Sequence, residues 1–582
     1  MDTLNIKING IEATVPAGIS ILEACHIAKI EIPTLCYLKE INEIGACRIC
    51  MVEANEGRGF RLVAACVYPV SNNMEILTNS PKVLDARKKT IELMLSTHER
   101  KCLSCTRSGK CELQTLAKQY GVDDEGYYDG VNINYEIDNS AAHMFRDNNK
   151  CILCRRCVAA CTVTQGIGVI GANERGFKTF IGSAFDMDLA DTSCVSCGQC
   201  INVCPTGALG EKDYTEEVFA ALANPDKHVI VQTAPAVRAA LGECFGLPIG
   251  TDVEGKMAAA LRRLGFDKVF DTDFAADLTI MEEGTEFIHR LQNGGTLPLI
   301  TSCSPGWIKF CEHYYPEFTE NLSSCKSPQQ MFGAVAKSYY AEKMNLKPED
   351  IILVSVMPCT AKKFECARPE MGRNGVPDVD YVITTRELGR MIDRAGIRFV
   401  DLDDEDFDAP LGLSTGAAVI FGVTGGVMEA ALRTVVEKLE NKELPSLDFK
   451  EVRGLEGIKE ASYTVAGTEV KLAIASSLSA ARELLDKIKA GEATYHFIEI
   501  MGCPGGCING GGQPQVSANV RNFTNFREKR ASVLYNNDAA KTIRKSHENE
   551  AVQQLYKEYL GEPGSHKAHE LLHTTYTKRS IN

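Results

Sequence analysis

The feature that most constrains the fold is a cysteine run that occurs twice. The spacing Cys-x2-Cys-x2-Cys-x3-Cys is present at Cys151, Cys154, Cys157 and Cys161, and again at Cys194, Cys197, Cys200 and Cys204. Bacterial domains that hold two [4Fe–4S] clusters use this run, and the fourth cysteine of each run ligates the other cluster. The spacing therefore predicts one cluster on Cys151, Cys154, Cys157 and Cys204, and a second on Cys194, Cys197, Cys200 and Cys161.

The rest of the composition agrees with a large metal-binding chain. The 582 residues include 24 cysteines, and the N-terminus lacks the charged start and apolar core of a signal peptide, which favours metal ligation in the cytoplasm over disulfides. A formal net charge of −14 argues against nucleic acid or an anionic membrane as the main partner. No run of about 20 apolar residues is present, so no membrane span is expected.

The first 78 residues predict a small β-rich domain with a [2Fe–2S] cluster. Two alternating runs, residues 4–8 and 12–15, flank the turn at Asn9 and Gly10, which is a strong hairpin signal. The Cys-x2-Cys pair typical of plant-type clusters has two outlying partners, and the four candidate ligands are Cys36, Cys47, Cys50 and Cys66. A zinc site is less favoured, because structural zinc usually takes two short Cys-x2-Cys units.

Residues 79–125 contain a second, mixed group of ligands. A helical run over residues 83–95 precedes His98, Cys102, Cys105 and Cys111. One imidazole and three thiolates suit either zinc or a [4Fe–4S] cluster. With the two runs in residues 126–210, the first third of the chain is interpreted as an electron relay of four clusters.

From residue 211 the pattern changes to buried strands alternating with helices, which predicts an α/β region with an open, largely parallel sheet. Several strands end in loops that carry cysteines, and ligands bind beyond the carboxyl ends of such strands. The cysteines expected to meet there are Cys303, Cys359, Cys503 and Cys507. Glycines in the last of these loops are expected to let the backbone approach a bulky group. The other cysteines, Cys25, Cys244, Cys311, Cys325 and Cys366, are interpreted as core thiols.

These loops, at residues 301–307, 356–363 and 499–510, resemble the three signature loops of the [FeFe]-hydrogenases. The chain is similar to the multi-cluster catalytic subunit of NAD(P)-linked or electron-bifurcating enzymes. The resemblance implies a multidomain α+β and α/β fold. Its parts are a β-grasp [2Fe–2S] domain at 1–78, a His-ligated [4Fe–4S] domain at 79–125, a ferredoxin-like 2[4Fe–4S] domain at 126–210, a two-lobed catalytic domain at 211–530, and a C-terminal tail resembling a small subunit at 531–582.

The implied cofactor of the catalytic domain is the H-cluster, a [4Fe–4S] cubane joined to a di-iron unit that carries CO, CN⁻ and a bridging dithiolate amine. By the resemblance, Cys507 bridges the two parts, and Cys503 and Cys359 ligate the cubane. Pro235, Gln329, Lys362 and Phe421 surround the di-iron unit, where Lys362 places positive charge beside a cyanide. Met357 and Met501 pack on the cluster.

The first loop departs from the family pattern Thr-Ser-Cys-Cys-Pro, because Ser304 stands where the fourth cubane ligand belongs. Three interpretations remain open. Ser304 binds iron as an alkoxide, although iron–sulfur sites prefer thiolate; Cys303 shifts to become the ligand; or the cubane is labile or absent.

The family's proton path maps onto Cys303, Glu283, Ser323, Glu286 and Arg290. The two glutamates are three residues apart in a helical pattern over residues 278–287 and share one helix face, although such pairs are usually solvated. The implied reaction is reversible heterolytic cleavage of H2, with protons leaving through Cys303 and the glutamates and electrons leaving along the clusters.

Two alternatives from other classes remain. A pure electron-transfer subunit, like the large peripheral subunit of complex I, lacks cysteine loops after residue 211. A hydrogen sensor usually carries a signalling domain, and no such pattern is seen. Because no nucleotide- or flavin-binding fingerprint stands out, NAD(P) chemistry is assigned to partner subunits that bind flavin, NAD(P) and iron–sulfur clusters, with ferredoxin as a further carrier.

Overall fold

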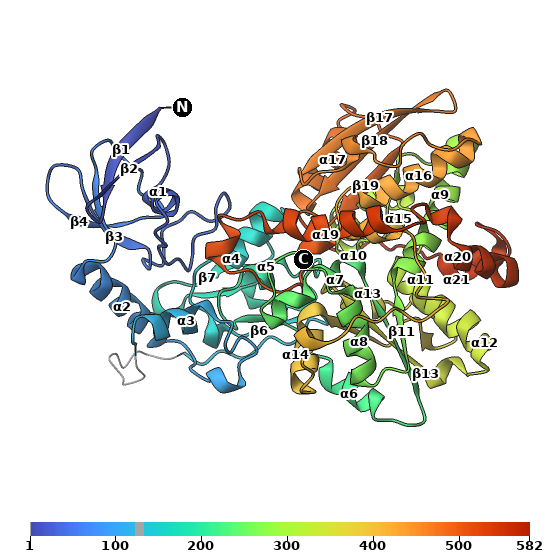
Figure 1. Cartoon of the computed structure of the whole chain (residues 1–582), viewed down its shortest axis with the longest axis horizontal. Helices are drawn as coiled ribbons and strands as arrows, with labels where there is room; N and C mark the ends of the chain where they lie inside the picture. Colours follow the sequence, from blue (N-terminus) through green and yellow to red (C-terminus); the bar gives the residue numbers. More distant parts are fainter. Residues whose placement is uncertain (1, 123–132, 582) are drawn as a thin grey trace.

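The computed structural model describes residues 2–122 and 133–581. Figure 1 shows the N-terminal sheet at one end of the long axis, the two sheets of residues 211–530 at the other, and the segment with the repeated cysteine runs between them. The expected boundary at residues 125/126 lies outside the described residues. No described helix is both long and apolar enough to cross a membrane.

The first unit is a five-stranded sheet in the order β2-β1-β5-β3-β4. The predicted hairpin is present with its turn at Asn9 and Gly10, and β1 also pairs in parallel with β5. Ser20 caps α1 through a reciprocal capping box with Glu23. The bounds are β1 (Thr3–Ile8), β2 (Ile11–Pro16), α1 (Ile21–Ile27), β3 (Met51–Asn55), β4 (Arg61–Ala64) and β5 (Glu75–Leu77).

The next two units are built from short elements around the cysteine groups. The predicted helix before His98 is α2 (Pro81–Leu95), and α3 (Glu112–Gln119) begins directly after Cys111. The segment with the repeated runs forms two small ladders, β6 with β9 and β7 with β8. Its elements are β6 (Met144–Arg146), α4 (Arg156–Ala159), β7 (Gly171–Asn173), β8 (Phe180–Gly182), α5 (Gln199–Val203) and β9 (Leu209–Glu211).

Residues 211–530 form two sheets, whereas the residue pattern predicted one open sheet and the family resemblance implied two lobes. The first has the order β11-β10-β13-β16 and is entirely parallel. Its central strands β10 and β13 are mostly apolar and almost fully buried, as expected for a sheet covered on both faces. The bounds are β10 (His228–Thr233), β11 (Lys268–Asp271), β13 (Ile351–Met357) and β16 (Tyr381–Thr384), with helices α6 (Thr215–Leu222), α7 (Pro235–Arg238), α8 (Glu254–Leu264), α11 (Pro328–Val335), α12 (Ala341–Met344), α13 (Ala361–Cys366) and α14 (Thr385–Arg394).

The second sheet has the order β12-β19-β18-β17 and is mixed. Its edge strand β17 alternates buried and exposed residues and pairs antiparallel with β18, so one face stays solvated. The bounds are β12 (Leu299–Ile300), β17 (Ile458–Val465), β18 (Thr468–Ser476) and β19 (Phe497–Met501), with helices α10 (Pro305–Tyr314), α15 (Gly416–Val419), α16 (Gly426–Glu440) and α17 (Leu478–Lys489). A two-residue ladder, β14 (Gly372–Arg373) with β15 (Val376–Pro377), stands apart.

Helix α9 (Asp273–Asn293) joins the two sheets. Phe274 and Leu278 pack in the core of the first sheet, whereas Ile280 and Phe287 pack in the core of the second. The helix that carries the predicted proton-path glutamates is therefore fixed on two sides.

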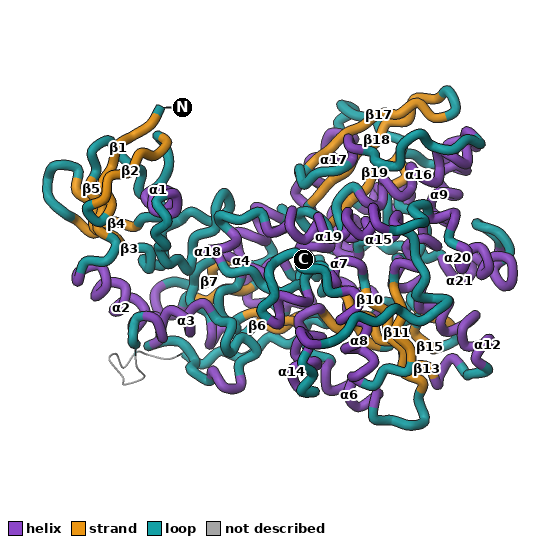
Figure 2. Tube along the Cα trace, in the orientation of Figure 1, coloured by secondary structure: helices purple, strands orange, loops and turns teal. Residues whose placement is uncertain are grey.

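The C-terminal segment runs back over the catalytic region. It is called the tail below and includes residues 518–530, which the sequence analysis counted with the catalytic domain. Its elements are α18 (Ala518–Arg521), α19 (Phe526–Ala540), α20 (Glu550–Leu555) and α21 (His566–Leu572). Figure 2 shows α19 crossing the middle of the molecule, and Leu534 packs with Val423 and Ile508 of the catalytic loops. The tail thus closes over the ends of the strands that build the site.

Candidate active site

One cavity lies where the carboxyl ends of strands from both sheets face each other. The loops that follow β10, β12, β13 and β19 all contribute to its wall. Its lining includes every residue predicted for the H-cluster site, namely Pro235, Cys303, Ser304, Gln329, Met357, Cys359, Lys362, Phe421, Met501, Cys503 and Cys507. Segments up to 203 residues apart in the sequence thus bring three thiols and a serine hydroxyl to one cavity, with Cys303 beside them.

The glycines of the third loop are needed for contacts between loops as well as for open space. Gly506 has φ +96°, and a Cβ there would lie 2.7 Å from the Thr424 backbone nitrogen. At Gly510, a Cβ would collide with the Pro358 carbonyl of the second loop. The prediction that these glycines make room for a cofactor is therefore incomplete, because they also let the loops touch each other.

Ser304 and Cys303 differ in what they face. The Ser304 hydroxyl accepts a hydrogen bond from the Gly502 backbone N–H at 3.2 Å, so it faces the loop that carries Cys503 and Cys507. Burial raises the pKa of the Cys303 thiol, and the negative charge of Glu283 adds to that increase.

Lys362 is a buried side chain with three fixed partners. Its ammonium donates to the Ser327 hydroxyl at 2.7 Å, to Glu365 Oε2 at 2.9 Å and to the Cys303 carbonyl at 3.2 Å. Glu365 and Ser327 were missed by the sequence reasoning, although the three-residue spacing of Lys362 and Glu365 at the start of a helix was a usable signal.

Three of the predicted proton-path residues, Glu283, Glu286 and Arg290, lie on α9, and Ser323 joins them from the segment after Asn321. Ser323 Oγ donates to Glu286 Oε2 at 2.9 Å, and Arg290 Nη2 donates to Glu286 Oε1 at 2.6 Å. Glu283 is 1% exposed and neither of its carboxyl oxygens has a hydrogen-bond partner within the described part of the chain. Burial, reinforced by the charge of Glu286, raises the pKa of Glu283 to about 8.

The repeated runs enclose two further cavities in the crossed arrangement predicted from the spacing. One is lined by Cys151, Cys154, Cys157 and Cys204, and the other by Cys161, Cys194, Cys197 and Cys200.

None of the 24 cysteines, all of which fall in the described ranges, forms a disulfide.

The second of these cavities is held directly against the catalytic loops. Gln199 donates to the Asn509 carbonyl at 2.8 Å, and Asn202 donates to the Gly510 carbonyl at 2.9 Å. Thr360, next to Cys359, donates to the Ser196 carbonyl at 2.8 Å. Sequence reasoning did not identify these polar anchors, because their partners are backbone atoms up to 310 residues away.

The two predicted ligand groups in the first 125 residues differ from each other in how closely their side chains are placed. Cys50 and Cys66 have their sulfur atoms 3.3 Å apart, and the Cys36 thiol lowers the pKa of Cys47 to about 6. His98 is half-buried; burial lowers its pKa to about 4, which keeps the imidazole neutral and able to ligate. Its Nδ1 has no hydrogen-bond partner among the residues described, and Cys102, Cys105 and Cys111 follow in the loop and turn before α3.

Two further buried charges position the third loop. Glu499 accepts from the backbone N–H groups of Gly425 at 2.6 Å and Met428 at 2.8 Å, which ties β19 to the start of α16. Arg530, in the tail, donates to the Ile508 carbonyl at 2.8 Å and pairs with Glu243. No sequence signal marked Arg530, because its role depends on where the tail folds back.

Comparison with known families covers most of the chain. The model "Iron only hydrogenase large subunit, C-terminal domain" matches residues 227–511, and "Iron hydrogenase small subunit" matches 524–579. The N-terminal third matches "2Fe-2S iron-sulfur cluster binding domain" at 1–81, "NADH-ubiquinone oxidoreductase-G iron-sulfur binding region" at 87–125 and "4Fe-4S dicluster domain" at 150–208.

Individual relatives agree with the family models. The NADP-reducing hydrogenase subunit HndD of Solidesulfovibrio fructosivorans is 54% identical over 100% of both chains. Iron hydrogenase 1 of Clostridium pasteurianum is 45% identical over 98% of this chain and 100% of its own. A solved variant of [FeFe]-hydrogenase HydA1 from Chlamydomonas reinhardtii has a TM-score of 0.58 and 43% identity, covering 64% of this chain and 100% of that one. The chain belongs to the [FeFe]-hydrogenase family, as a catalytic large subunit with an N-terminal iron–sulfur relay.

Proposed function

We propose that this hydrogenase oxidises H2 or reduces protons at an H-cluster held in the cavity between the two sheets, as the catalytic subunit of an NADP-linked complex. The observation that carries the proposal is the convergence of Cys359, Cys503 and Cys507 on that cavity. A set of thiols in a mostly apolar wall suits an iron–sulfur group and not a hard cation.

The residues present fit the cofactor. Cys507 would bridge the cubane and the di-iron unit, and Cys359, Cys503 and Ser304 would complete the cubane ligands. Pro235, Gln329, Phe421 and the two methionines would surround the cluster, with Lys362 offering its charge to a cyanide. When bound, the H-cluster supplies the iron at which the H–H bond is made or broken and the amine that exchanges a proton with the protein.

In this proposal, Cys303 exchanges protons with the cofactor in the cavity. The remaining residues of the path carry the protons to the surface, and they are Glu283, Ser323, Glu286 and Arg290. With a pKa of about 8, Glu283 carries its proton at neutral pH and can donate it. Ser323 and Glu286 are already hydrogen-bonded at 2.9 Å, and Arg290 forms an ion pair with Glu286 at 2.6 Å.

Electrons leave along the relay. We assign a β-grasp [2Fe–2S] domain to 1–78, a His-ligated [4Fe–4S] cluster to 79–125, two ferredoxin-type [4Fe–4S] clusters to 126–210, a two-lobed catalytic domain to 211–530 and a small-subunit-like tail to 531–582. The contacts of Gln199 and Asn202 with residues 509–510 support transfer between the second ferredoxin-type cluster and the cubane.

The relative HndD is named as an NADP-reducing hydrogenase subunit. By that likeness, we propose that this chain belongs to an NADP-linked complex. We further propose, from the family resemblance of the sequence, a cytoplasmic location, partner subunits that bind flavin, NAD(P) and iron–sulfur clusters, and ferredoxin as a further carrier.

Infrared spectroscopy tests the cofactor and the reaction together. Protein matured anaerobically with a di-iron precursor should show CO and CN⁻ stretching bands and should take up or evolve H2 with a redox dye. Absence of both the bands and H2 turnover would overturn the proposal.

A further inference from the structure

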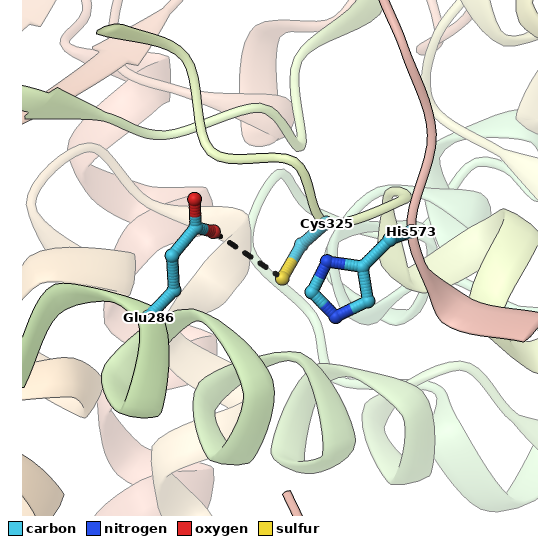
Figure 3. A group of neighbouring side chains, drawn as sticks. All are labelled: Glu286, Cys325 and His573. Carbon is cyan, nitrogen blue, oxygen red and sulfur yellow. Dashed lines mark hydrogen bonds between the residues drawn. The ribbon is translucent and has the colours of Figure 1, made fainter. Parts of the chain in front are cut away.

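Three metal-ligating side chains meet beside the proposed proton path and belong to none of the cluster motifs. Glu286 comes from α9, Cys325 precedes α11, and His573 directly follows α21 in the tail. One ligand atom of each lies within 4.8 Å of the others. Figure 3 shows the Cys325 sulfur between the Glu286 carboxylate and the His573 ring. A carboxylate, a thiol and an imidazole are therefore directed to one point.

The His573 ring is held in an orientation that suits a ligand. Its Nε2 lies 3.2 Å from Glu282 Oε2, and Glu282 is fixed in turn by the Gly564 N–H at 2.9 Å and the Tyr556 hydroxyl. Because the Glu282 carboxylate accepts a hydrogen bond from Nε2, the ring proton is on Nε2 and the lone pair is on Nδ1. Metal-binding histidines are commonly held in this way by a carboxylate that accepts from the nitrogen opposite the metal. The Ser324 hydroxyl lies 2.8 Å from Nδ1 and is the group that an ion would displace.

Both oxygens of Glu286 are hydrogen-bonded. Arg290 pairs with Oε1 at 2.6 Å, and the Ser324 backbone N–H donates to Oε1 at 3.4 Å and to Oε2 at 3.2 Å. Oε2 also accepts from Ser323 at 2.9 Å and lies 3.9 Å from the Cys325 sulfur, so an ion that ligated Oε2 on the Cys325 side would have to displace or weaken the hydrogen bond from Ser323. Binding of a metal and the hydrogen bond in the proton path therefore compete for one atom.

We propose that Glu286, Cys325 and His573 bind Zn²⁺ and that the bound ion inhibits turnover by withdrawing Glu286 from Ser323. The inhibitory part rests on the proposed proton path. Zinc takes sulfur, nitrogen and oxygen ligands at about 2.0–2.3 Å in tetrahedral geometry. Such ligand atoms lie about 3.3–3.6 Å apart, so the pair formed by the Cys325 sulfur and Glu286 Oε2, now 3.9 Å apart, has to close by only a few tenths of an ångström. The thiol gives up its proton to solvent when the metal binds.

An entry path exists on the outer side of the site. A surface cleft is lined by Lys326, Arg373, Asp378, Glu570 and His573, so the imidazole is reachable without opening the catalytic cavity. The fourth coordination position would be left to water or to an inhibitor, as in open zinc sites.

Zinc binding is tested on the full chain with its clusters assembled. After dialysis against chelator-buffered Zn²⁺, elemental analysis should find about one zinc per wild-type chain, and none above background in Cys325→Ala or His573→Gln. The matched control is Cys311→Ala, which removes another fully buried thiol and should keep the zinc. Glu282→Gln should bind about 10–100-fold more weakly, because it loosens the ring. Equal zinc in wild type and Cys325→Ala would overturn the site.

Inhibition is tested in the same samples by dye-linked H2 oxidation, each variant being compared with its own metal-free rate. Zinc should slow the wild type at least about tenfold at saturation, the effect expected for one lost proton-transfer group being 10²–10⁴; a chelator should restore the rate, and Cys325→Ala should be insensitive. Zinc that binds without slowing turnover would overturn the inhibitory role and the assignment of Glu286 to proton transfer. Normal H2 turnover with no bound zinc would overturn the site and leave the hydrogenase function standing.

Discussion

At the scale of single residues, Ser304 and Cys303 decide how the cubane is held. Both line the cavity, but the Ser304 hydroxyl bonds to Gly502 on the third loop, whereas Cys303 is influenced by Glu283 on α9. This difference supports our proposal that Ser304 is the fourth cubane ligand and Cys303 the proton relay. It also makes the two roles separable by mutation.

Ser304→Ala should lower the iron content by about four atoms per chain, because a cubane with three ligands is easily lost. Cys303→Ala should keep that iron and lose H2 turnover. Iron analysis with Mössbauer spectroscopy measures the first effect and a dye assay the second. Ser304→Cys, which supplies a full thiolate set, serves as the control and should retain the cluster. The reverse pattern, with iron lost from Cys303→Ala, would show that Cys303 is the ligand.

Glu283→Gln should reduce H2 turnover by about 10²–10⁴-fold, the usual value of one proton-transfer group. Reduction of the N-terminal clusters by dithionite should be unchanged, which controls for folding.

The wild-type carboxyl of Glu283 also affects the stability of the folded protein. Because its folded pKa, about 8, lies above the ordinary value of 4.5, the folded state becomes less stable as pH rises between those values. The variant should lack that part of the pH dependence in thermal unfolding, and an unchanged profile would contradict the raised pKa.

At the scale of elements, the third loop depends on glycines that no other residue can replace. Gly506→Ala combines a positive φ of +96° with a clash at the Thr424 nitrogen, so the free energy of unfolding should fall by about 1–3 kcal/mol or more. The control Gly467→Ala has a similar φ of +80° but nothing within 4 Å, and should cost only about 1–2 kcal/mol. Thermal unfolding measures both. H2 turnover should fall in Gly506→Ala alone; equal losses would mean that the clash relaxes.

At the scale of elements, some features of the fold and the site could be predicted from the sequence and others could not. The grouping of the cysteines of residues 151–204 around two cavities was predictable because their spacing is local. The meeting of Cys359, Cys503 and Cys507 was predictable because parallel strands end at one edge. The second sheet could not be predicted from the apolar runs, since nothing in them tells which strands will pair. Nor could the roles of Glu499 and Arg530, because each is fixed by contacts made only after distant segments fold together.

At the scale of the molecule, the order of domains along the chain becomes an order along the long axis (Figure 1). The sheet of residues 1–78 lies farthest from the catalytic cavity. The catalytic cavity is adjoined instead by the cavity that is lined by Cys161, Cys194, Cys197 and Cys200. Electrons for a partner subunit would therefore travel most of the length of the protein, while a small dye can react at a nearer cluster.

This geometry predicts that damage to the far end separates two activities. In Cys50→Ser, which loses one of two thiols whose sulfur atoms lie 3.3 Å apart, the [2Fe–2S] cluster should be lost. H2-driven NADP⁺ reduction by the assembled complex should then fall at least about tenfold, since a missing cluster leaves a gap in the relay, whereas dye reduction by H2 should stay near the wild-type rate. Cys25→Ser removes a buried thiol in α1 of the same domain, which has no predicted ligand role, and should change neither rate. An intact NADP⁺ rate in cluster-free Cys50→Ser would place the exit at the His98 group instead, because electrons would then bypass the first domain.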